Sequence, residues 1–311
     1  MYDAMIVGGG PAGLNAALIL GRCRRRVVLF DSGAPRNVAA HKLHGYLGHD
    51  GIKPSELLAL GRRELAKYSV EIVSDTVHSA EPLRRSPEHP FNTGFVLHTA
   101  GGRAMIGRKL LLATGVVDTL PDVPGLRECY GRSVHHCPYC DGWEHADEHL
   151  LAWGKTAQAA AGLGLLLRTW TSRVTVLLRS APLESDYRQR LAHNGVAICD
   201  EPVVELLHNE GRLTAARLAS GESLPATGLF FNTSYVAHSD LPAMLGCEFA
   251  APETAATSNK QQTCVSGLFL AGDADGEVQF AIVAAAEGAS AGVAINRELQ
   301  DEDQAAEARN C

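Results

Sequence analysis

The chain has 311 residues, of which 46% are hydrophobic and 20% are charged, and its formal net charge is -7. This length can bury one large core or two medium ones, and the composition is typical of a globular protein rather than a disordered one. The acidic balance, with no basic block beyond the short cluster at residues 22–26, argues against nucleic-acid binding. We interpret that cluster as a solvated loop between a helix and the next strand.

The distribution of cysteines and the N-terminal sequence indicate the cellular compartment. The eight cysteines are scattered, and only Cys137 and Cys140 have a close, suggestive spacing. A secreted disulfide scaffold would be shorter and denser in cysteine, and the N-terminus lacks the features of a signal peptide. No run reaches the roughly 18 apolar residues that a membrane span needs. We therefore expect a cytoplasmic protein with neither a membrane nor a nucleic-acid partner.

The first predicted element is an apolar strand at residues 2–7, which leads through a glycine-rich turn into a helix. Gly8, Gly10 and Gly13 form the pattern G-x-G-x-x-G. Gly8 permits a tight turn, Gly10 lets the backbone approach a pyrophosphate, and Gly13 allows close helix–strand packing. The start of the helix offers N–H groups and a partial positive charge to phosphates.

A second strand, within RRVVLFDSG, ends at Asp31. This position is where an acid can bind a ribose hydroxyl. The glycine pattern alone is weak evidence for a dinucleotide site. Here it lies between a strand and a helix, and an acid follows at the end of the next strand, so together these features predict such a site. At this point the dinucleotide is either FAD or NAD(P).

Two later segments favour FAD. Residues 109–115 read KLLLATG, an apolar strand with a glycine turn, and residues 267–299 contain a strand, an Ala-Gly-Asp turn and a long helix of small residues. In this order and at this separation, GGGPAG, ATG and AGDA resemble the FAD domain of the pyridine-nucleotide-disulfide oxidoreductases. A short chain with CxxC near its middle is similar to the thioredoxin reductase branch. The resemblance covers nearly the whole chain apart from the tail DEDQAAEARNC.

The resemblance implies which residues would hold FAD. The glycine pattern and Asp31 would hold the pyrophosphate and ribose, and Val77 would lie by the adenine. Asp273 would bind the ribityl–phosphate region, a role compatible with capping a helix, and Gln279 and Phe280 would lie near the flavin ring. The full expected set is Gly8, Gly10, Pro11, Ala12, Gly13, Asp31, Val77, Ala113, Thr114, Gly115, Gly272, Asp273, Gln279, Phe280 and Ala281.

The expected fold class is α/β, with two Rossmann-like, three-layer dinucleotide-binding domains, the second inserted in the first. Because the last FAD motif follows residue 267, the FAD domain must be discontinuous, over residues 1–118 and 237–311. The inserted domain, residues 119–236, follows the proline-rich PDVPGL. It contains HLLAWGKTAQAAAGLGLLLRTW and RVTVLLRS, a second strand–helix–strand unit.

The cradle of the inserted domain departs from an NADPH site at three places. Where a relative would read G-x-G-x-x-A, residues 152–157 read AWGKTA, so a Cβ crowds the tight turn. The next strand ends Leu-Arg-Ser at 178–180, with one arginine where a 2′-phosphate would use two. A later glycine turn is replaced by Asn-Thr-Ser at 232–234. We expect this domain to have lost efficient use of NADPH, although Lys155 and Arg179 could hold a phosphate weakly.

The stretch HHCPYCDGWEH, residues 135–145, carries the CxxC pair. A zinc site needs four ligands, and CxxC supplies two, so the neighbouring histidines would have to complete it: His135, His136, His145 and His149. An inert disulfide is a second alternative. We favour a working dithiol and no metal, because CxxC spacing lowers a thiol pKa and gives an exchangeable disulfide.

Family resemblance suggests the roles within this stretch. Cys140 would face the flavin, Cys137 would exchange with the substrate thiol, and Asp141 would move a proton at the flavin–thiol centre. The flanking residues look more like the flavin-dependent dithiol oxidases of the gliotoxin and holomycin type. Those enzymes carry His where this chain has Asp141, so His136 is the candidate base.

These features lead to one hypothesis and two alternatives. The hypothesis is an NADPH-independent dithiol oxidase that closes a disulfide in a small molecule or peptide, with oxygen as electron acceptor. The alternatives are a reductase of thioredoxin-like proteins fed by NADPH or ferredoxin, and a flavin-loaded redox sensor. By resemblance we expect a homodimer through the FAD domain. The histidine-bearing segment 37–51 is expected near the flavin, without an assigned role.

Overall fold

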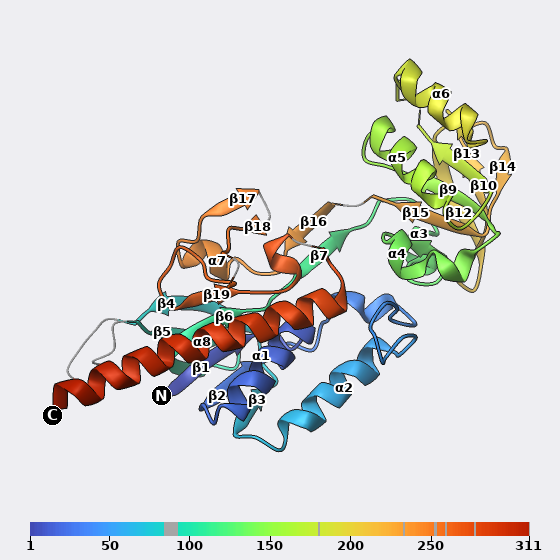
Figure 1. Cartoon of the computed structure of the whole chain (residues 1–311). Coiled ribbons are helices and arrows are strands. Elements are labelled where there is room, and N and C mark those ends of the chain that lie inside the picture. Colours follow the sequence, from blue (N-terminus) through green and yellow to red (C-terminus); the bar gives the residue numbers. More distant parts are fainter. Residues whose placement is uncertain are drawn as a thin grey trace. The chain divides into compact units, whose positions relative to one another are not determined.

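The computed structural model describes residues 1–83, 93–179, 181–232, 234–251, 254–258, 260–276 and 278–310. The chain divides into two compact units (Figure 1). The first comprises Met1–Val38, Tyr46–Val117 and Tyr235–Cys311, and the second comprises Ala39–Gly45 and Asp118–Ser234. Two residues of the altered nucleotide cradle, Ser180 and Thr233, lie outside the described residues.

A seven-stranded sheet forms the centre of the first unit, in the order β3-β2-β1-β6-β5-β4, with β19 also paired to β6. Its strands are β1 (Tyr2–Val7), β2 (Val27–Phe30), β3 (Val70–Val73), β4 (Val77–Pro82), β5 (Phe95–Thr99), β6 (Ala104–Leu112) and β19 (Leu268–Leu270). Strands β3, β2, β1, β6 and β19 run parallel, whereas β5 is antiparallel to both β6 and β4. Strands β2 and β19 are apolar and buried throughout, as is typical of parallel strands whose two faces are both covered.

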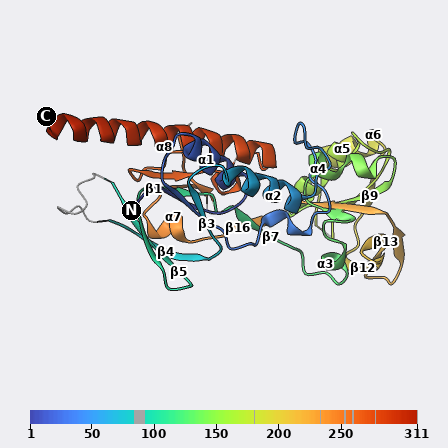
Figure 2. The same cartoon turned by 90° about the horizontal axis from the view of Figure 1, so that it is seen from below.

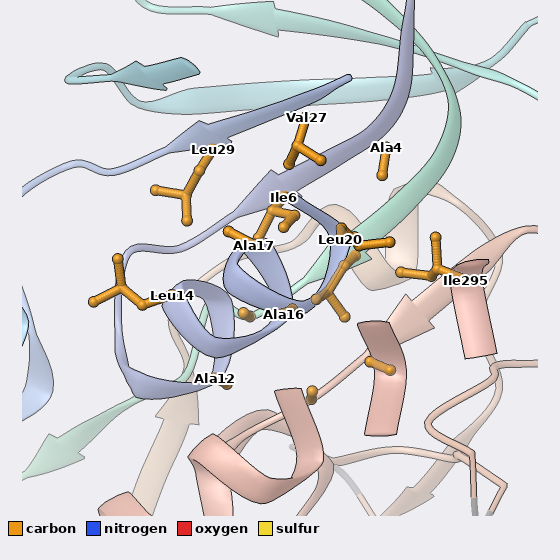
Figure 3. Packing of buried hydrophobic residues seen from close by; sticks show 14 of the residues in the cluster. Ala4, Ile6, Ala12, Leu14, Ala16, Ala17, Leu20, Val27, Leu29 and Ile295 are labelled. Carbon is orange, nitrogen blue, oxygen red and sulfur yellow. The ribbon is translucent and has the colours of Figure 1, made fainter. Parts of the chain in front are cut away.

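Helices pack on one face of this sheet (Figures 1 and 2), and their apolar side chains form a buried core with those of the strands. The helices of the unit are α1 (Pro11–Arg22), α2 (Pro54–Leu65), α7 (Leu241–Met244) and α8 (Ala281–Asn310). Ile6 and Leu29 of the sheet meet Ala16 and Leu20 of α1 and Ile295 of α8 (Figure 3). Small residues allow the two helices to approach closely. A Cβ on Gly288 would lie 2.0 Å from the backbone oxygen of Ala12.

Helix α8 continues through the acidic tail, where it is tied to β6 by a buried ion network. Lys109 Nζ lies 2.7 Å from both Glu298 Oε2 and Glu302 Oε1. Arg108 reaches Glu302 Oε2 at 2.8 Å and Asp303 Oδ1 at 2.8 Å. The side chains of Arg108 and Lys109 are only 6% and 2% exposed, so these charges depend on their partners for solvation.

The basic cluster at residues 22–26 is less solvated than the sequence suggested. It does connect α1 to β2, but the side chain of Arg25 is only 14% exposed. Its Nη1 lies 2.7 Å from Asp303 Oδ2, and its Nε donates to Asn296 Oδ1 at 2.8 Å. The expectation of a solvated cluster was therefore wrong for Arg25. Its partners lie more than 270 residues away, so local sequence gave no sign of them.

The Glu302 carboxyl provides a test of this network. Burial acts to raise its pKa, but hydrogen bonds from Lys109 and Arg108, together with their charges, lower the pKa below its usual range. A lowered carboxyl pKa contributes stability above the unfolded value of about 4.3, and this contribution is lost as the pH falls through the folded value. We expect Glu302→Gln to reduce the free energy of unfolding at pH 7 by about 3 kcal/mol. The free energy of unfolding of the Glu302→Gln variant should then fall less between about pH 5 and pH 3 than that of the wild type.

Urea unfolding at several pH values measures both effects. Glu307→Gln is the matched control, because Glu307 is an exposed residue of the same helix. It should leave stability and acid dependence unchanged. Identical acid dependence in the Glu302→Gln variant and the wild type would contradict the role assigned to this carboxylate.

The second unit contains a smaller parallel sheet in the order β11-β10-β9-β15-β8. Its strands are β8 (Val134–His135), β9 (His149–Trp153), β10 (Arg173–Leu177), β11 (Ala197–Cys199) and β15 (Gly228–Phe231). An antiparallel sheet adds β12 (Val203–Asn209), β13 (Arg212–Leu218) and β14 (Ser223–Pro225), and β7 (Val116–Thr119) pairs with β16 (Ser234–Ala237). The helices of this part are α3 (Leu126–Cys129), α4 (Pro138–Asp141), α5 (Ala157–Leu167) and α6 (Ser185–His193).

A short segment of the N-terminal half, Ala39–Gly45, belongs to the second unit. Gly131 adopts a positive φ of 77°, and a Cβ there would lie 2.3 Å from the backbone oxygen of Ala39. His44 Nε2 lies 3.2 Å from Glu144 Oε1, four residues beyond the CxxC pair. The segment is therefore held by both a close backbone approach and an ion pair.

The fold class predicted from the sequence, α/β with two Rossmann-like units, is confirmed. In the part of the chain that the structure describes, no helix combines the length and the apolar character that crossing a bilayer requires.

Candidate functional site

The motif residues of the first unit gather at one edge of its sheet. Gly8 follows β1, Asp31 follows β2, Ala113 follows β6, and the Ala271–Gly272 pair follows β19. Because these strands are parallel and adjacent, their carboxyl ends share one edge. In open α/β sheets this edge is where ligands bind.

The three glycines of the first turn have different surroundings. Gly8 has a φ of 116°, and a Cβ there would lie 2.0 Å from Ala113 O. A Cβ on Gly13 would lie 1.9 Å from Gly8 O, so the packing of α1 on β1 requires glycine. A Cβ on Gly10 would meet no atom within 4 Å. The absence of a side chain at Gly10 therefore leaves open space at the start of α1.

The start of α1 is suited to an anion. Gly10 is its N-cap residue, Pro11 opens the helix, and no side chain caps it. The first backbone N–H groups of a helix lack partners within the helix and carry a partial positive charge. With open space beside Gly10, they fit a phosphate or pyrophosphate group.

Asp31 is positioned by two donors. Its Oδ1 accepts a hydrogen bond from Gly33 N at 2.9 Å, and its Oδ2 is paired with the Arg62 guanidinium of α2. The carboxylate also lies against Gly9, where a Cβ would approach Asp31 Cγ to 2.3 Å. Asp31 is thus fixed beside the glycine turn, at the position where a ribose hydroxyl would need an acceptor.

A second arginine joins the remaining motif residues. Arg36 Nη1 donates to Asp273 Oδ2 at 2.8 Å and to Gln279 Oε1 at 2.7 Å. Two predicted cofactor-binding residues that precede α8 are thereby brought together with the loop after β2. Sequence analysis missed both Arg36 and Arg62. Arg36 lies in a loop without periodicity, and Arg62 is one of several charged residues on α2.

The other predicted cofactor-binding residues lie nearby in the fold. Thr114 and Gly115 continue the turn after β6, and Phe280 and Ala281 lead into α8. Val77 begins β4 and shares a buried cluster with residues at the ends of β2 and β3. Taken together, the amides of α1, the Asp31 carboxylate and the open space at Gly10 fit an adenine dinucleotide.

The CxxC pair of the second unit is a disulfide in this structure. Cys137 and Cys140 are bonded, with their Cα atoms 5.3 Å apart. Cys137 caps the short helix α4, and Cys140 N donates to Cys137 O at 3.1 Å. Pro138 occupies the first helical position, where its fixed φ suits a helix start. Within the described ranges, no group of three or more His, Cys, Asp or Glu side chains is placed to hold a metal ion.

His136, the candidate base, is oriented by a tyrosine. Its Nδ1 lies 3.1 Å from Tyr130 Oη, which in turn donates to Asp118 Oδ2 at 3.2 Å. Tyr130 has a single proton, and an ionised Asp118 can only accept, so His136 donates from Nδ1. In this tautomer Nε2 is the basic nitrogen.

Asp141 contacts a different histidine, which the sequence analysis considered only as a zinc ligand. Asp141 Oδ1 lies 3.3 Å from His135 Nδ1. His135 in turn lies 3.1 Å from His145, between their Nε2 atoms. The two histidines are ten residues apart in an irregular stretch, and no sequence pattern pairs them.

The altered cradle of the second unit has contacts of its own. Ala152 and Trp153 end β9 and are buried, and the Arg179 guanidinium carbon lies 4.8 Å from the centroid of the Trp153 ring. A Cβ on Gly154 would lie 2.2 Å from Ala160 N, so this glycine serves the packing of α5. Thr156 Oγ1 accepts from Ala159 N at 3.1 Å and caps the helix start, where phosphate would otherwise bind.

Three other cysteines are poorly suited to redox exchange. Burial raises the pKa of the thiols of Cys129, Cys199 and Cys247. A raised pKa reduces the fraction of reactive thiolate at neutral pH.

A glycine-rich turn suited to a dinucleotide in one Rossmann-like unit and a CxxC disulfide in the other are typical of two-domain disulfide oxidoreductases. The chain belongs to the pyridine nucleotide-disulphide oxidoreductase family, whose sequence profile matches residues 2–288. It is therefore an enzyme of the thioredoxin reductase-like type, as the resemblance in its sequence implied. Members of this family are flavoproteins that typically use FAD.

Individual relatives agree with this assignment. The chain is 30% identical to a probable thioredoxin reductase of Arthroderma benhamiae, over 97% of this chain and 81% of that protein. It is 29% identical to thioredoxin reductase sirT of Leptosphaeria maculans, over 99% and 98% of the two chains. Among solved structures, HlmI superimposes with a TM-score of 0.93 and 35% identity, covering 99% of this chain and 96% of HlmI.

Proposed function

We propose that this protein is an FAD-dependent dithiol oxidase that works without NADPH. It closes a disulfide in a small molecule or peptide through the Cys137–Cys140 pair, and oxygen is the final electron acceptor. The observation that carries this proposal is the contrast between the two cradles. One offers open space and helix amides to a dinucleotide, whereas in the other Thr156 caps the helix start and Arg179 stacks on Trp153.

The altered cradle argues against nicotinamide as electron donor. Dinucleotide binding uses a tight glycine turn and the N–H groups at the helix start. Here Ala152 stands where the first glycine would be, and the Thr156 hydroxyl already accepts from Ala159 N. The single arginine suited to a 2′-phosphate is stacked on Trp153. Recruiting Arg179 for a phosphate would mean giving up this cation–π contact, which is worth about 0.5–2 kcal/mol.

The residues of the first unit would hold FAD, with the pyrophosphate at the start of α1 and the ribose at Asp31. When bound, FAD supplies a two-electron acceptor that oxygen can reoxidise. Arg36 would orient Asp273 and Gln279 toward the cofactor, and Arg62 would fix the Asp31 carboxylate.

The cysteine pair carries out the thiol exchange. A substrate thiolate attacks Cys137 Sγ, a mixed disulfide forms, and Cys140 leaves as a thiolate. The second substrate thiolate then attacks the substrate sulfur of the mixed disulfide. The oxidised substrate leaves, and Cys137 is released as a thiolate. His136 Nε2 accepts a proton from the substrate thiol, so that the attacking species is the thiolate.

Two anaerobic mixing experiments test the proposal. A dithiol such as dithiothreitol should bleach the yellow flavin absorbance, whereas NADPH at the same concentration should not. In air, the dithiol should drive oxygen uptake, with one hydrogen peroxide formed for each disulfide. Rapid bleaching by NADPH would contradict the NADPH-independent assignment, but it would not contradict the proposed disulfide chemistry.

A reductase of thioredoxin-like proteins is the second candidate. It is favoured by Asp141 directly after the pair, as in the reductases, and by relatives named thioredoxin reductases. Reduction of an oxidised thioredoxin by this protein, with NADPH or reduced ferredoxin as electron donor, would support this second candidate. In both cases we propose a homodimer through the FAD-binding unit, which light scattering during gel filtration measures.

A further inference from the structure

Four side chains near the disulfide form a continuous line in the second unit. Asp141 Oδ1 lies 3.3 Å from His135 Nδ1. His135 Nε2 lies 3.1 Å from His145 Nε2, and His145 Nδ1 lies 2.7 Å from Glu148 Oε2. The His135–His145 and His145–Glu148 contacts are hydrogen bonds, whereas the Asp141–His135 contact is slightly longer than an ordinary hydrogen bond.

The surroundings separate the two ends of this line. The side chains of His135 and His145 are 7% and 10% exposed, and both rings pack against Phe230. The Glu148 side chain is 39% exposed, so this end reaches solvent. At the other end, Asp141 directly follows Cys140 on the same short helix.

The hydrogen positions along the line follow from its partners. An ionised carboxylate only accepts, so His145 donates from Nδ1 to Glu148, and two facing Nε2 atoms attract only with one hydrogen between them. Two neutral imidazoles supply these two hydrogens. His135 Nδ1 then faces Asp141 Oδ1 as an acceptor, and an added proton at this position would complete the line.

We propose that Asp141, His135, His145 and Glu148 form a proton relay between the Cys137–Cys140 pair and solvent. A proton from a thiol enters at Asp141, a proton shifts from His135 to His145, and another leaves Glu148 for water. Each thiol becomes a thiolate, one proton reaches solvent for each, and no electrons move within the relay. His135, His145 and Glu148 are positioning residues that act through Asp141. The relay rests on the proposed dithiol chemistry only for the source of its protons.

Nuclear magnetic resonance of the full-length holoenzyme, labelled with ¹⁵N in histidine, tests the proton count directly. At neutral pH we expect protons on Nδ1 of both His135 and His145, with one further proton shared between their Nε2 atoms. In Glu148→Gln the amide donates to His145 Nδ1, so the added proton should be lost. Two neutral rings in the wild type, unchanged in Glu148→Gln, would overturn the relay whatever the enzyme's substrate.

Kinetics test the function of the line. Anaerobic flavin bleaching by dithiothreitol should slow about 100-fold in His145→Ala and in Glu148→Gln. Added imidazole should restore at least half of the lost rate in His145→Ala and none in Glu148→Gln. His149→Ala is the matched control, since His149 lies close by but hydrogen-bonds Thr175 instead. Its rate should equal that of the wild type.

The outcomes separate the relay from the proposed function. If flavin bleaching is slow in His145→Ala and imidazole does not restore it, the role of His145 is only structural. Wild-type bleaching rates in Glu148→Gln, a substitution at a half-exposed position, would show that Glu148 takes no part in a relay. If no dithiol reduces the wild type at all, the proposed function fails, while the histidine spectra still decide the relay.

Discussion

Cys140→Ser will abolish dithiol-driven oxygen uptake, to less than about one thousandth of the wild-type rate, while the protein stays folded and yellow. Serine nearly matches cysteine in size, so the turn at α4 and its hydrogen bond to Cys137 O should persist. The disulfide between residues 137 and 140 cannot form, however, and without it a substrate dithiol has no sulfur to attack. Oxygen electrode traces with dithiothreitol measure the loss.

The two cysteines should also differ in trapping experiments. In Cys140→Ser, the remaining Cys137 thiolate should attack an added disulfide and hold it as a stable mixed disulfide, seen by mass spectrometry of the intact protein. Cys137→Ser should trap much less, because Cys140 is expected to face the flavin. Cys23→Ser replaces an exposed free thiol of the first unit and should behave as the wild type. Oxygen uptake that survives in Cys140→Ser would rule out the CxxC mechanism.

Alanine at the two glycines of the first turn will have opposite effects. Gly10→Ala places a methyl group in open space, so the apoprotein should lose less than about 1 kcal/mol of stability. The same methyl group should occupy pyrophosphate space and weaken FAD binding about 100-fold, equivalent to about 2.7 kcal/mol. Gly13→Ala puts a Cβ 1.9 Å from Gly8 O, so the apoprotein itself should lose at least about 3 kcal/mol.

Flavin fluorescence titration of the apoprotein and its thermal unfolding separate the two effects. Gly162→Ala is the control for adding a methyl group to a helical glycine, because nothing lies within 4 Å of a Cβ there. Unchanged FAD affinity in Gly10→Ala would mean that the pyrophosphate does not bind at the start of α1.

The sequence could predict those parts of the fold that depend on local pattern. The strand at residues 2–7 matches β1, and the small-residue helix after AGDA matches α8 because its apolar face and glycines repeat along the chain. The glycine turn was predictable for the same reason. Each glycine is needed because a side chain would clash with the backbone or with a bound phosphate, as it does wherever a strand leads through a phosphate-binding turn into a helix.

The parts that could not be predicted depend on contacts between distant residues. Arg36 reaches Asp273 across more than 230 positions, and Lys109 reaches Glu298 across almost 190. The His135–His145 pair lies in a stretch without helical or strand periodicity. For the second cradle, the sequence revealed a missing glycine. It did not reveal that Trp153 is buried in the core or that Arg179 stacks on it.

The assignment of Ala39–Gly45 to the second unit has a practical consequence for protein engineering. A fragment cloned as residues 118–234 would omit the segment that closely approaches Gly131 and carries the partner of Glu144. Such a fragment would leave part of its own surface uncovered and would be prone to aggregate. Chimeras that exchange this unit between homologous enzymes should therefore transplant the seven-residue N-terminal piece together with the main insert.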